Sequence, residues 1–428
     1  MHPFNIPDNI FTAALDARVP LTIAAVYAVT VKLATRYNLS RNKKAWPISR
    51  TRPFFAFVVL HNILLAVYSA WTFWGMLSGM RRSIVSPLGP GGPAATADTF
   101  CHVHGPAGLG NSIYYDDLTG SWGSLSRDGA AAMVNGAPSN LQPGRLWNEG
   151  LAYYGWIFYL SKFYEVLDTF IILAKGKPSS TLQTYHHAGA MLCMWAGIRY
   201  MASPIWVFVL VNSFIHALMY TYYTLTALSV KIPMFIKRTL TTMQITQFVV
   251  GGSYTMVHSF VSYVVPVIIP SNAAAAAAAA TAPVGSPAAN ALDSIRKLVF
   301  GDAADKAAAA PASSSETIHV AQPCIVTAGE TFAIWLNVLY LAPLTYLFVS
   351  FFIASYVKRS NAASKMNGKA DRRPSNVHLA EKAGWDAARG IEREVYGGEN
   401  MVGGGSAAVD DDLSAAPAKK SAKSRKRV

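Results

Sequence analysis

The sequence predicts an all-α, polytopic membrane protein in which seven transmembrane helices enclose a cavity that opens to the cytosol. Three observations support this fold class. The chain of 428 residues is 52% hydrophobic and only 14% charged, a composition closer to that of membrane bundles than of soluble enzymes. Apolar runs of about 20 residues, the length that crosses a bilayer as a helix, recur along it. Lysine and arginine, 37 residues against 23 acidic ones, gather between these runs.

The predicted spans follow one another from residue 19 to residue 357. The first is the weakest, because it is short and ends at Lys32. The sixth is too long for a single span, and we expect it to end near Tyr263. The seven segments are Val19–Leu33, Pro53–Met76, Leu151–Ala174, Thr181–Tyr200, Pro204–Leu228, Arg238–Ile269 and Thr331–Val357.

The basic residues orient the bundle. They lie in the linker after the first span, in the loops after the third and fifth spans, and in the tail after the seventh. With seven spans all four segments are on one side, which the positive-inside rule makes cytosolic. The N-terminus, residues 1–18, is then luminal and the C-terminus cytosolic. Without the weak first span, the N-terminus would move to the cytosol. The positive charge is thus explained by topology, and we expect no nucleic-acid partner.

Two long loops and a tail lie outside the predicted seven-helix domain, residues 19–357. Residues 81–150 and 270–330 are the luminal loops, and the second is of low complexity with a tract of eight alanines. Residues 358–428 form a polar tail that we expect to be disordered and cytosolic. Cys101 and Cys324 both fall on the luminal side, where disulfides form. A disulfide between them and two free thiols are both open at this point.

Polar residues inside the spans are the main functional signal, because a charged side chain at mid-bilayer costs about 2.5–3.5 kcal/mol. In the third span Lys162, Glu165 and Asp168 share one helix face. They could form an ion-pair ladder that fixes helix packing. Alternatively, one carboxylate accepts a hydrogen bond from a histidine of the next helix and sets its tautomer.

The next three spans place further polar groups near the same cytosolic end. The fourth span carries a pair of adjacent histidines one turn after a glutamine. The fifth carries an asparagine, a histidine and two tyrosines on one face, and the sixth opens with two glutamines. These residues could join the helices by hydrogen bonds or contact a substrate. They are Gln183, His186 and His187; Asn212, His216, Tyr220 and Tyr223; and Gln244 and Gln247.

Together these residues predict a polar cavity with a basic rim. The rim suits a ligand with phosphates at one end, and the apolar helices below it suit an alkyl chain, the shape of an acyl-CoA. Each rim charge alone is also explained as a positive-inside anchor. The rim consists of Lys175, Lys177, Lys231, Lys237 and Arg238.

Four ordered motifs make the chain resemble the ELO family of very-long-chain fatty acid elongases, with the closest likeness to fungal or other microbial members. They are Lys162-x-x-Glu165-x-x-Asp168-Thr169, the histidine box Gln183-x-x-His186-His187, Asn212-x-x-x-His216-x-x-Met219-Tyr220-x-Tyr222-Tyr223, and Thr241-x-x-Gln244-x-x-Gln247. The resemblance implies a 3-oxoacyl-CoA synthase of the endoplasmic reticulum membrane. Such an enzyme condenses acyl-CoA with malonyl-CoA, releases carbon dioxide and CoA, and needs no cofactor or metal. The other enzymes of the elongation cycle are expected partners, and a homodimer is left open.

The resemblance leads to a mechanistic hypothesis. His186 attacks the thioester to form an acyl-imidazole, and His216 with Asn212 stabilises the developing negative charge. His187 is expected to bond Asp168 or Glu165. We expect the other polar residues of the motifs and the rim to bind substrate. The family's usual box begins with histidine, whereas this chain has Gln183, whose amide cannot titrate near neutral pH.

Two alternatives come from other functional classes. The pair His186-His187 also resembles one box of membrane di-iron desaturases and oxygenases. However, only five histidines, His61, His186, His187, His216 and His258, fall in predicted spans, which is few for two metal ions. The second alternative is a non-catalytic, acyl-CoA-binding paralogue, for which Gln183 is the best argument.

Overall fold

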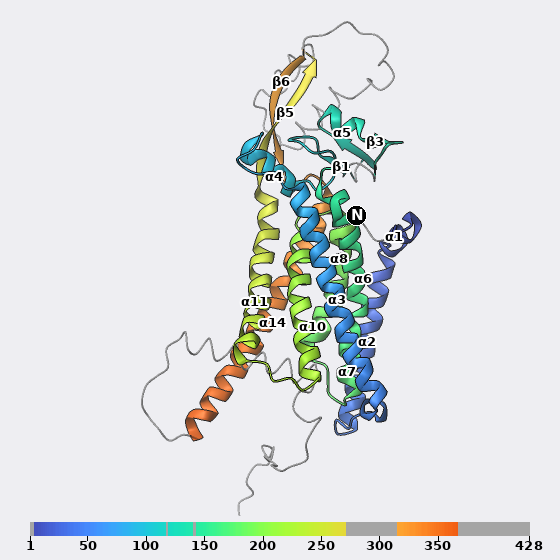
Figure 1. The fold of residues 1–428 in the computed structure, drawn as a ribbon, viewed down its shortest axis with the longest axis vertical. Coiled ribbons are helices and arrows are strands. Elements are labelled where there is room, and N and C mark those ends of the chain that lie inside the picture. Colours follow the sequence, from blue (N-terminus) through green and yellow to red (C-terminus); the bar gives the residue numbers. More distant parts are fainter. Residues whose placement is uncertain (1–3, 117–118, 140–142, 271–314, 367–428) are drawn as a thin grey trace, which may run out of the picture.

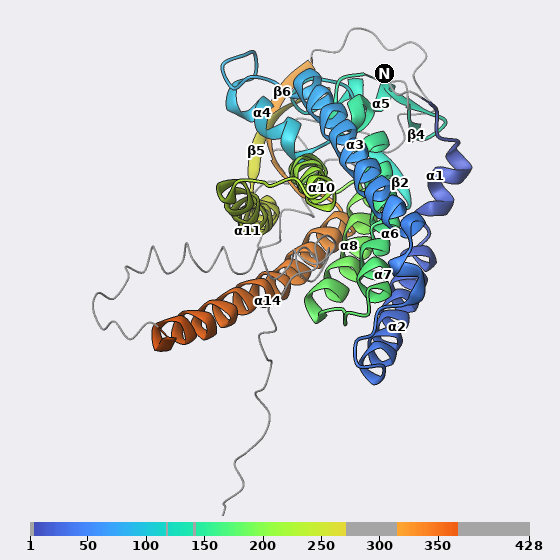
Figure 2. The same ribbon diagram turned by 60° about the horizontal axis from the view of Figure 1, so that its bottom comes forward.

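Long helices run side by side in a bundle, and a small mixed unit covers one end of it (Figure 1). The computed structural model describes residues 4–116, 119–139, 143–270 and 315–366. We call the covering unit the cap and the two ends of the bundle the cap end and the open end. Helices α2 and α11 lie on opposite sides of the bundle with α8 and α10 between them (Figure 2).

The bundle contains both continuous and broken helices. The continuous ones are α2 (Arg18–Ser40), α3 (Arg52–Ser83), α8 (Thr181–Arg199), α11 (Met234–Val257) and α14 (Ala328–Met366). One broken helix joins η2 (Trp147–Gly155), α6 (Trp156–Tyr164) and α7 (Val166–Ala174), and another joins α9 (Ile205–Val207), η3 (Phe208–Asn212) and α10 (Ser213–Ala227). Short helices α1 (Asp8–Ala14) and η1 (Pro47–Arg50) flank α2.

Four helices within the described residues are long and apolar enough to cross a membrane. They are Arg18–Ser40, Arg52–Ser83, Ile205–Ala227 and Ala328–Val349. These include the first predicted span, whose short apolar run extends into a helix of 23 residues. The protein is therefore a largely helical, multi-pass membrane protein, with four of the seven predicted spans supported by length and composition.

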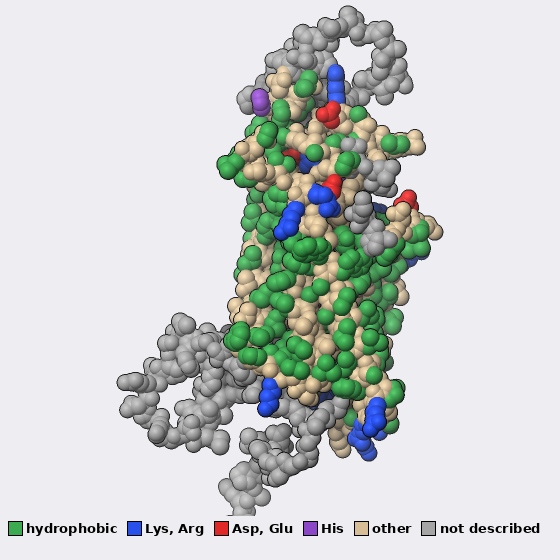
Figure 3. Space-filling model, viewed as in Figure 1, with side chains coloured by type: hydrophobic (Ala, Val, Ile, Leu, Met, Phe, Trp, Pro, Cys, Tyr) green, Lys and Arg blue, Asp and Glu red, His purple; other side chains and the backbone are tan. Residues whose placement is uncertain are grey.

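The outer surface of the bundle is apolar where it would meet lipid. Large hydrophobic side chains are exposed along the helices, such as Leu60 and Val67 on α3 and Leu339 on α14. Figure 3 shows hydrophobic side chains along the bundle, with lysine and arginine near its two ends. Exposed apolar side chains of this kind are stable in a bilayer and would be a liability in water.

The cap accounts for most of residues 81–150, which the sequence predicted as a long luminal loop, and its strands depart from the predicted all-α class. It contains helix α4 (Gly92–Cys101), hairpin β1 (Ile113–Asp116) with β2 (Ser121–Ser124), helix α5 (Arg127–Ala131), and the short pair β3 (Met133–Val134) with β4 (Ala137–Pro138). The hairpin of β5 (Ser262–Pro270) and β6 (Ser315–Pro323) completes it. All three strand pairs are antiparallel.

The sixth predicted span, Arg238–Ile269, was expected to end near Tyr263, and the helix ends earlier than that. Helix α11 ends at Val257, a 3-10 turn η4 (His258–Phe260) follows, and the chain continues as β5. In β5 Val265 is buried, whereas Val264 is half exposed. This alternation is typical of a strand with one buried face. The sequence does not reveal it, because both faces carry apolar residues and an apolar run of this kind also fits a helix.

Two predicted boundaries also change. The low-complexity loop 270–330 is shorter than expected, because Ser315–Pro323 pairs with β5 and Ala328 begins α14. The alanine tract lies outside the described residues. The polar tail expected from residue 358 begins later, because α14 continues to Met366. The rest of the tail also lies outside the described residues.

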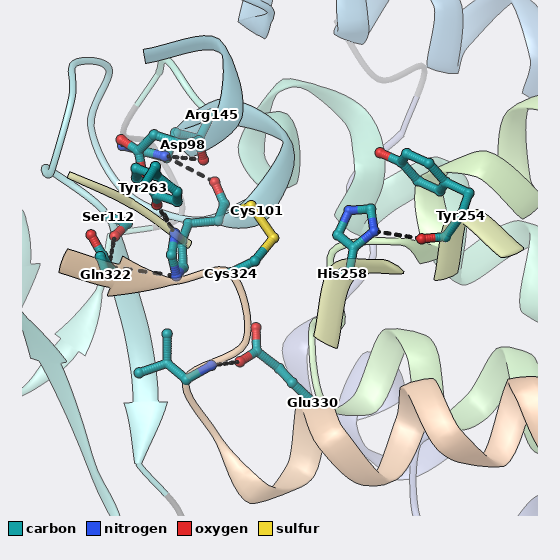
Figure 4. Close-up of a disulfide and its surroundings, with 12 residues drawn as sticks. Asp98, Cys101, Ser112, Arg145, Tyr254, His258, Tyr263, Gln322, Cys324 and Glu330 are labelled. Carbon is teal, nitrogen blue, oxygen red and sulfur yellow. Dashed lines mark hydrogen bonds and ion pairs between the residues drawn. A yellow bond between two sulfur atoms is a disulfide. The ribbon is translucent and has the colours of Figure 1, made fainter. Parts of the chain in front are cut away.

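A disulfide and a buried charge cluster hold the cap together (Figure 4). Cys101, at the end of α4, is bonded to Cys324, directly after β6. Nearby, Asp98 accepts a hydrogen bond from Arg145 at 2.7 Å and another from the Tyr263 hydroxyl at 2.6 Å. Burial alone would raise the pKa of Asp98, but its bond with His102 and the charge of Arg145 outweigh that effect and lower it. The cap is thus built around an ionised carboxylate.

Candidate active site

A cavity of about 110 Å3 lies between α7, α8, α10, α11 and α14, toward the open end of the bundle. We call it the histidine cavity. Residues from all four sequence motifs meet in its walls, although they are spread over more than 80 residues of the chain. They include Glu165, Asp168, Gln183, His186, His187, His216, Tyr220, Tyr223, Gln244 and Gln247.

Glu165 is the centre of the charged wall. It lies between α6 and α7, where the helix is interrupted, and its side chain is buried. Its Oε1 accepts hydrogen bonds from Lys162 Nζ at 2.7 Å and from Ser161 Oγ at 2.8 Å. The Lys162 ammonium also donates to Asn212 Oδ1 at 3.3 Å. The i,i+3 ion pair predicted from the sequence is therefore present, and it reaches a further motif residue on the neighbouring helix.

Asp168 has different partners from those expected. His61 Nε2 lies 2.8 Å from its Oδ1, and the Tyr220 hydroxyl donates to its Oδ2 at 2.7 Å. His61 comes from α3, and both its ring and Asp168 are buried. Sequence reasoning gave His61 no role in the site. The only signal was an ionisable residue in an apolar helix, which does not identify its partner.

His187 is bonded to Gln183 and not to a carboxylate, so the prediction that it pairs with Asp168 or Glu165 is wrong. The Nε2 atoms of the two side chains are 2.9 Å apart. An amide nitrogen only donates, and His187 Nε2 must therefore accept. Both residues lie on one face of α8, one turn apart, so their side chains are neighbours. The carboxylates of Asp168 and Glu165 come from another helix. Gln183 Nε2 also approaches Thr169 Oγ1, which is paired with Tyr27 of α2.

His186 is the freer of the two box histidines. It is partly exposed in the histidine cavity, and among the described residues its imidazole has no hydrogen-bond partner. Its ring stands nearly perpendicular to that of His187, with centroids 5.2 Å apart. The backbone of this turn is fixed by Tyr340 of α14, whose hydroxyl donates to the His186 carbonyl at 2.8 Å. Gly189 permits the contact, because a Cβ there would lie 2.0 Å from the Tyr340 ring.

His216 faces Glu165 from α10. Its Nδ1 is 3.7 Å from Glu165 Oε1, which is too long for a hydrogen bond, and it has no partner in the described structure. The ring packs edge-on against Tyr220 at 5.6 Å. The helix before it contains the π-helical turn η3, which ends at Asn212. Such turns shift the direction of the side chains that follow and often occur at functional sites.

A second cavity of about 280 Å3 adjoins the first and shares Ile215 and Gln247 with it. It lies between η3, α10 and α11 and is lined mainly by apolar side chains, among them Phe208, Val211 and Val250. Because α11 runs toward the cap, this cavity extends from the histidines in that direction. We call it the apolar cavity. Gln247 lies at the junction, where Asn212 donates to its Oε1 at 3.4 Å. Gln244 lies in the wall of the histidine cavity and contacts the Met219 sulfur.

The predicted basic rim is only partly described. Lys175 and Lys177 follow α7 at the open end, and both are half-buried. Burial and the neighbouring charge of Lys177 lower the pKa of Lys175 to about 8. Lys231 is exposed. Lys237 and Arg238 belong to α11, but their side chains lie outside the described part of the structure.

No group of three or more histidine, cysteine, aspartate or glutamate side chains within the described residues has the geometry to hold a metal ion. Glu165 is instead paired with Lys162, Asp168 with His61 and Tyr220, and His187 with Gln183. The di-iron alternative therefore finds no ligand set in this part of the chain, since membrane di-iron centres need many histidines around two ions.

Comparison with known proteins agrees with the motifs. The model of the GNS1/SUR4 (ELO) family matches residues 12–364. Fatty acid elongase sre1 of Dictyostelium discoideum is 38% identical over 125 residues, 29% of this chain and 44% of the relative. Putative fatty acid elongase 2 of Schizosaccharomyces pombe is 32% identical over 121 residues, 28% and 33% of the two chains. Very long chain fatty acid elongase 3 of Homo sapiens is 35% identical over 105 residues, which are 24% of this chain and 39% of the relative.

These alignments are local. They cover less than half the length of each curated relative, whereas the family model covers most of this chain. No solved structure matches the chain. On the strength of the family match, and with the four motifs meeting in one cavity, the protein belongs to the GNS1/SUR4 (ELO) family, whose curated members here are named fatty acid elongases.

Proposed function

We propose that the protein is the condensing enzyme of fatty acid elongation, a 3-oxoacyl-CoA synthase that joins acyl-CoA to malonyl-CoA. The observation that carries this proposal is the histidine cavity, where a histidine without a hydrogen-bond partner lies beside a second, oriented histidine and a buried ion pair. A site of this kind can activate a thioester while it excludes water, which would otherwise hydrolyse an acylated intermediate.

His186 is the proposed nucleophile. A neutral imidazole nitrogen attacks the thioester carbon, a C–N bond forms, and the C–S bond breaks. The proton lost from the imidazolium leaves with the thiolate as free CoA. His187 is less suited to this role, because its Nε2 lone pair accepts the hydrogen bond of Gln183. Gln183 thus donates to His187 the hydrogen bond that an imidazole N–H would donate from the same position. A histidine box that begins with glutamine can therefore still orient His187.

Malonyl-CoA supplies the carbon nucleophile of the second step. Loss of carbon dioxide leaves an enolate that attacks the acyl carbon. A C–C bond forms, the C–N bond to the imidazole breaks, and the departing ring nitrogen takes up one proton from solvent, which gives 3-oxoacyl-CoA and neutral His186. His216 and Asn212 are the proposed donors to the enolate or carbonyl oxygen. They face the cavity region from one side of the α10 helix, and Asn212 is held between Lys162 and Gln247. No cofactor or metal takes part in this scheme.

The apolar cavity is the proposed path of the acyl chain. It begins at Ile215 and Gln247 beside the histidines and continues toward the cap. Ligand pockets commonly measure about 300–1,000 Å3, and the histidine cavity is smaller, about 110 Å3. We propose that the walls of the histidine cavity separate on binding and that α11 moves outward, because it lies at the side of the bundle (Figure 2).

The proposed topology has seven spans, with the cap in the lumen of the endoplasmic reticulum. The disulfide lies in the cap, which fits an oxidising compartment. The N-terminal segment also packs at the cap end, where Trp195 donates to the Leu15 carbonyl at 2.8 Å. The open end, with Lys175 and Lys177, is then cytosolic, where CoA substrates are found, and the C-terminal tail lies on the same side.

The decisive assay gives detergent-purified protein labelled malonyl-CoA and a series of saturated and unsaturated acyl-CoAs. We expect labelled 3-oxoacyl-CoA from the wild type and almost none from His186→Ala or His216→Ala. His319→Ala is the matched control, because His319 is exposed on β6 and lines neither the histidine cavity nor the apolar cavity. If no member of the series yields labelled product, the protein is not a condensing enzyme and the acyl-CoA-binding alternative gains support.

A further inference from the structure

A large cavity at the cap end is separate from the cavities of the proposed reaction. It measures about 630 Å3 and lies between the cap, the α1–α2 junction, the end of α8 and the start of α14. We call it the cap cavity. Its volume is typical of a site for a small organic ligand, about 300–1,000 Å3. Among the residues that the structure describes, no motif residue lines it, so the condensation reaction leaves this space unexplained.

Aromatic rings form one wall of the cap cavity in a continuous row. Tyr115 and Trp122 pair edge-to-face across β1 and β2 with centroids 5.2 Å apart. Trp122 contacts the ring of His104 at 5.6 Å, and His104 stacks on Trp147 at 6.2 Å. Phe11 and Tyr200 contribute further rings to the lining. Aromatic faces carry negative electrostatic potential, so a surface of this kind attracts cations, above all methylated ammonium groups.

A buried carboxylate reinforces this preference. Glu330 lines the cavity from the first turn of α14 and is 7% exposed. Its Oε2 accepts hydrogen bonds from the backbone of Val326 and Thr327, at 3.1 and 3.0 Å. Among the described residues no lysine, arginine or histidine forms a salt bridge with it. A buried carboxylate without a cation is costly, and a cationic ligand would supply the missing charge.

The other ionisable groups of the lining are paired, neutral or at its margin. His102 also lines the cavity, and its Nδ1 is bonded to the Tyr263 hydroxyl and lies 3.4 Å from Asp98 Oδ1. Asp16 is already paired with Arg18 at 2.6 Å. Burial and the charge of Arg145 lower the pKa of His104 to about 4, so its ring is neutral at physiological pH. Arg199 is the one exposed cation among the described lining residues and lies over the Tyr200 ring at 5.7 Å. The cavity therefore combines an aromatic and acidic interior with a guanidinium at its margin.

From this arrangement we propose that the cap cavity binds a phosphocholine group. The trimethylammonium would lie against Trp122 and near Glu330, and the phosphate would bond Arg199. A primary ammonium needs three hydrogen-bond acceptors, whereas the methylated cation needs only ring faces and one carboxylate. The group can come from a membrane lipid or from soluble phosphocholine, because the chemistry recognised is the same. The inference does not depend on the proposed condensing activity.

Binding is tested on the full-length protein in two arms. Isothermal titration calorimetry with soluble phosphocholine uses protein in a choline-free detergent, and native mass spectrometry uses protein in nanodiscs of phosphatidylcholine or of phosphatidylglycerol. The variants are Glu330→Gln, which keeps an acceptor for the backbone, and Trp122→Leu. Their matched controls are Asp128→Asn, an exposed carboxylate of the same cap, and Trp74→Leu, an exposed tryptophan of α3. The intact Cys101–Cys324 disulfide reports that each variant has folded.

We expect phosphocholine or phosphatidylcholine to bind the wild type and both controls, and each cavity variant to weaken binding by about tenfold or more. Retention from nanodiscs alone, with the same pattern among variants, identifies the lipid as the source. Either of two results would overturn the inference: no binding of the choline group in either arm, or binding that Glu330→Gln and Trp122→Leu leave unchanged. Equal retention of phosphatidylglycerol would overturn it as well.

Discussion

The hydrogen bond between Gln183 and His187 makes a specific prediction about the histidine box. At 2.9 Å between the two Nε2 atoms, the glutamine amide donates and the imidazole accepts. Gln183→Leu removes the donor and leaves a nitrogen of the buried His187 ring unsatisfied, which costs about 1–3 kcal/mol. If that cost falls on the transition state, kcat/KM for condensation decreases by about 5- to 150-fold. Gln183→His restores a donor, and we expect activity within about threefold of the wild type.

Gln183→Glu tests whether the site needs a hydrogen-bond donor or only a polar side chain at this position. A carboxylate only accepts, so His187 would have to carry a proton on Nε2 and become a donor. We expect this variant to be less active than Gln183→Leu, because it reverses the hydrogen bond and adds a charge near Glu165. The assay measures kcat/KM with labelled malonyl-CoA for all three variants. Thr184→Val is the control, since the Thr184 hydroxyl bonds only near the start of α8. Equal activity of the glutamate and histidine variants would refute the reasoning.

Three further predictions concern the ion pair, the apolar cavity and the cap. Lys162→Met should destabilise the protein by about 3–5 kcal/mol, because it leaves Glu165 buried and unpaired; adding Glu165→Gln should recover much of the melting temperature, and a double variant as unstable as the single one would contradict this. Val211→Trp, which fills the apolar cavity, should shift product formation toward shorter acyl-CoAs, whereas Leu218→Trp on the outer face of α10 should not; an unchanged chain-length profile would remove the proposed acyl path. The pKa of His104 is lowered from 6.5 to about 4 in the folded protein. Between these pH values the imidazole is protonated in the unfolded state but neutral in the folded state. The free energy of unfolding should therefore fall by up to about 3 kcal/mol as the pH decreases from 6.5 to 4. A smaller loss of melting temperature between pH 7 and pH 5 in His104→Phe would support this, and an identical loss would not.

Much of the site could be predicted from local spacing. Lys162 and Glu165 are three residues apart on a helix, and their ion pair follows from that spacing. Gln183 and His187 are four residues apart, and their bond has the same origin, although we assigned His187 to a carboxylate. The family resemblance is confirmed by the match over residues 12–364.

The partners supplied by distant helices could not be predicted. His61 is 107 residues from Asp168, and Tyr27 is 142 residues from Thr169. A single sequence gives no signal that pairs such residues, since the contact depends on how whole helices pack. The β5–β6 hairpin was missed for a related reason. Its apolar strand follows α11 after the short turn η4. Only the pairing with Ser315–Pro323, across a long separation in sequence, distinguishes it from the end of a membrane span.

The central claim is that His186 carries the acyl group, and mass spectrometry tests it directly. Purified protein is incubated with acyl-CoA in the absence of malonyl-CoA, and the intact mass, the modified peptide and the free CoA are measured together. We expect release of CoA in proportion to an acyl adduct on His186, and neither in His186→Ala. Unmodified protein that still forms 3-oxoacyl-CoA once malonyl-CoA is added would contradict the claim and favour direct condensation.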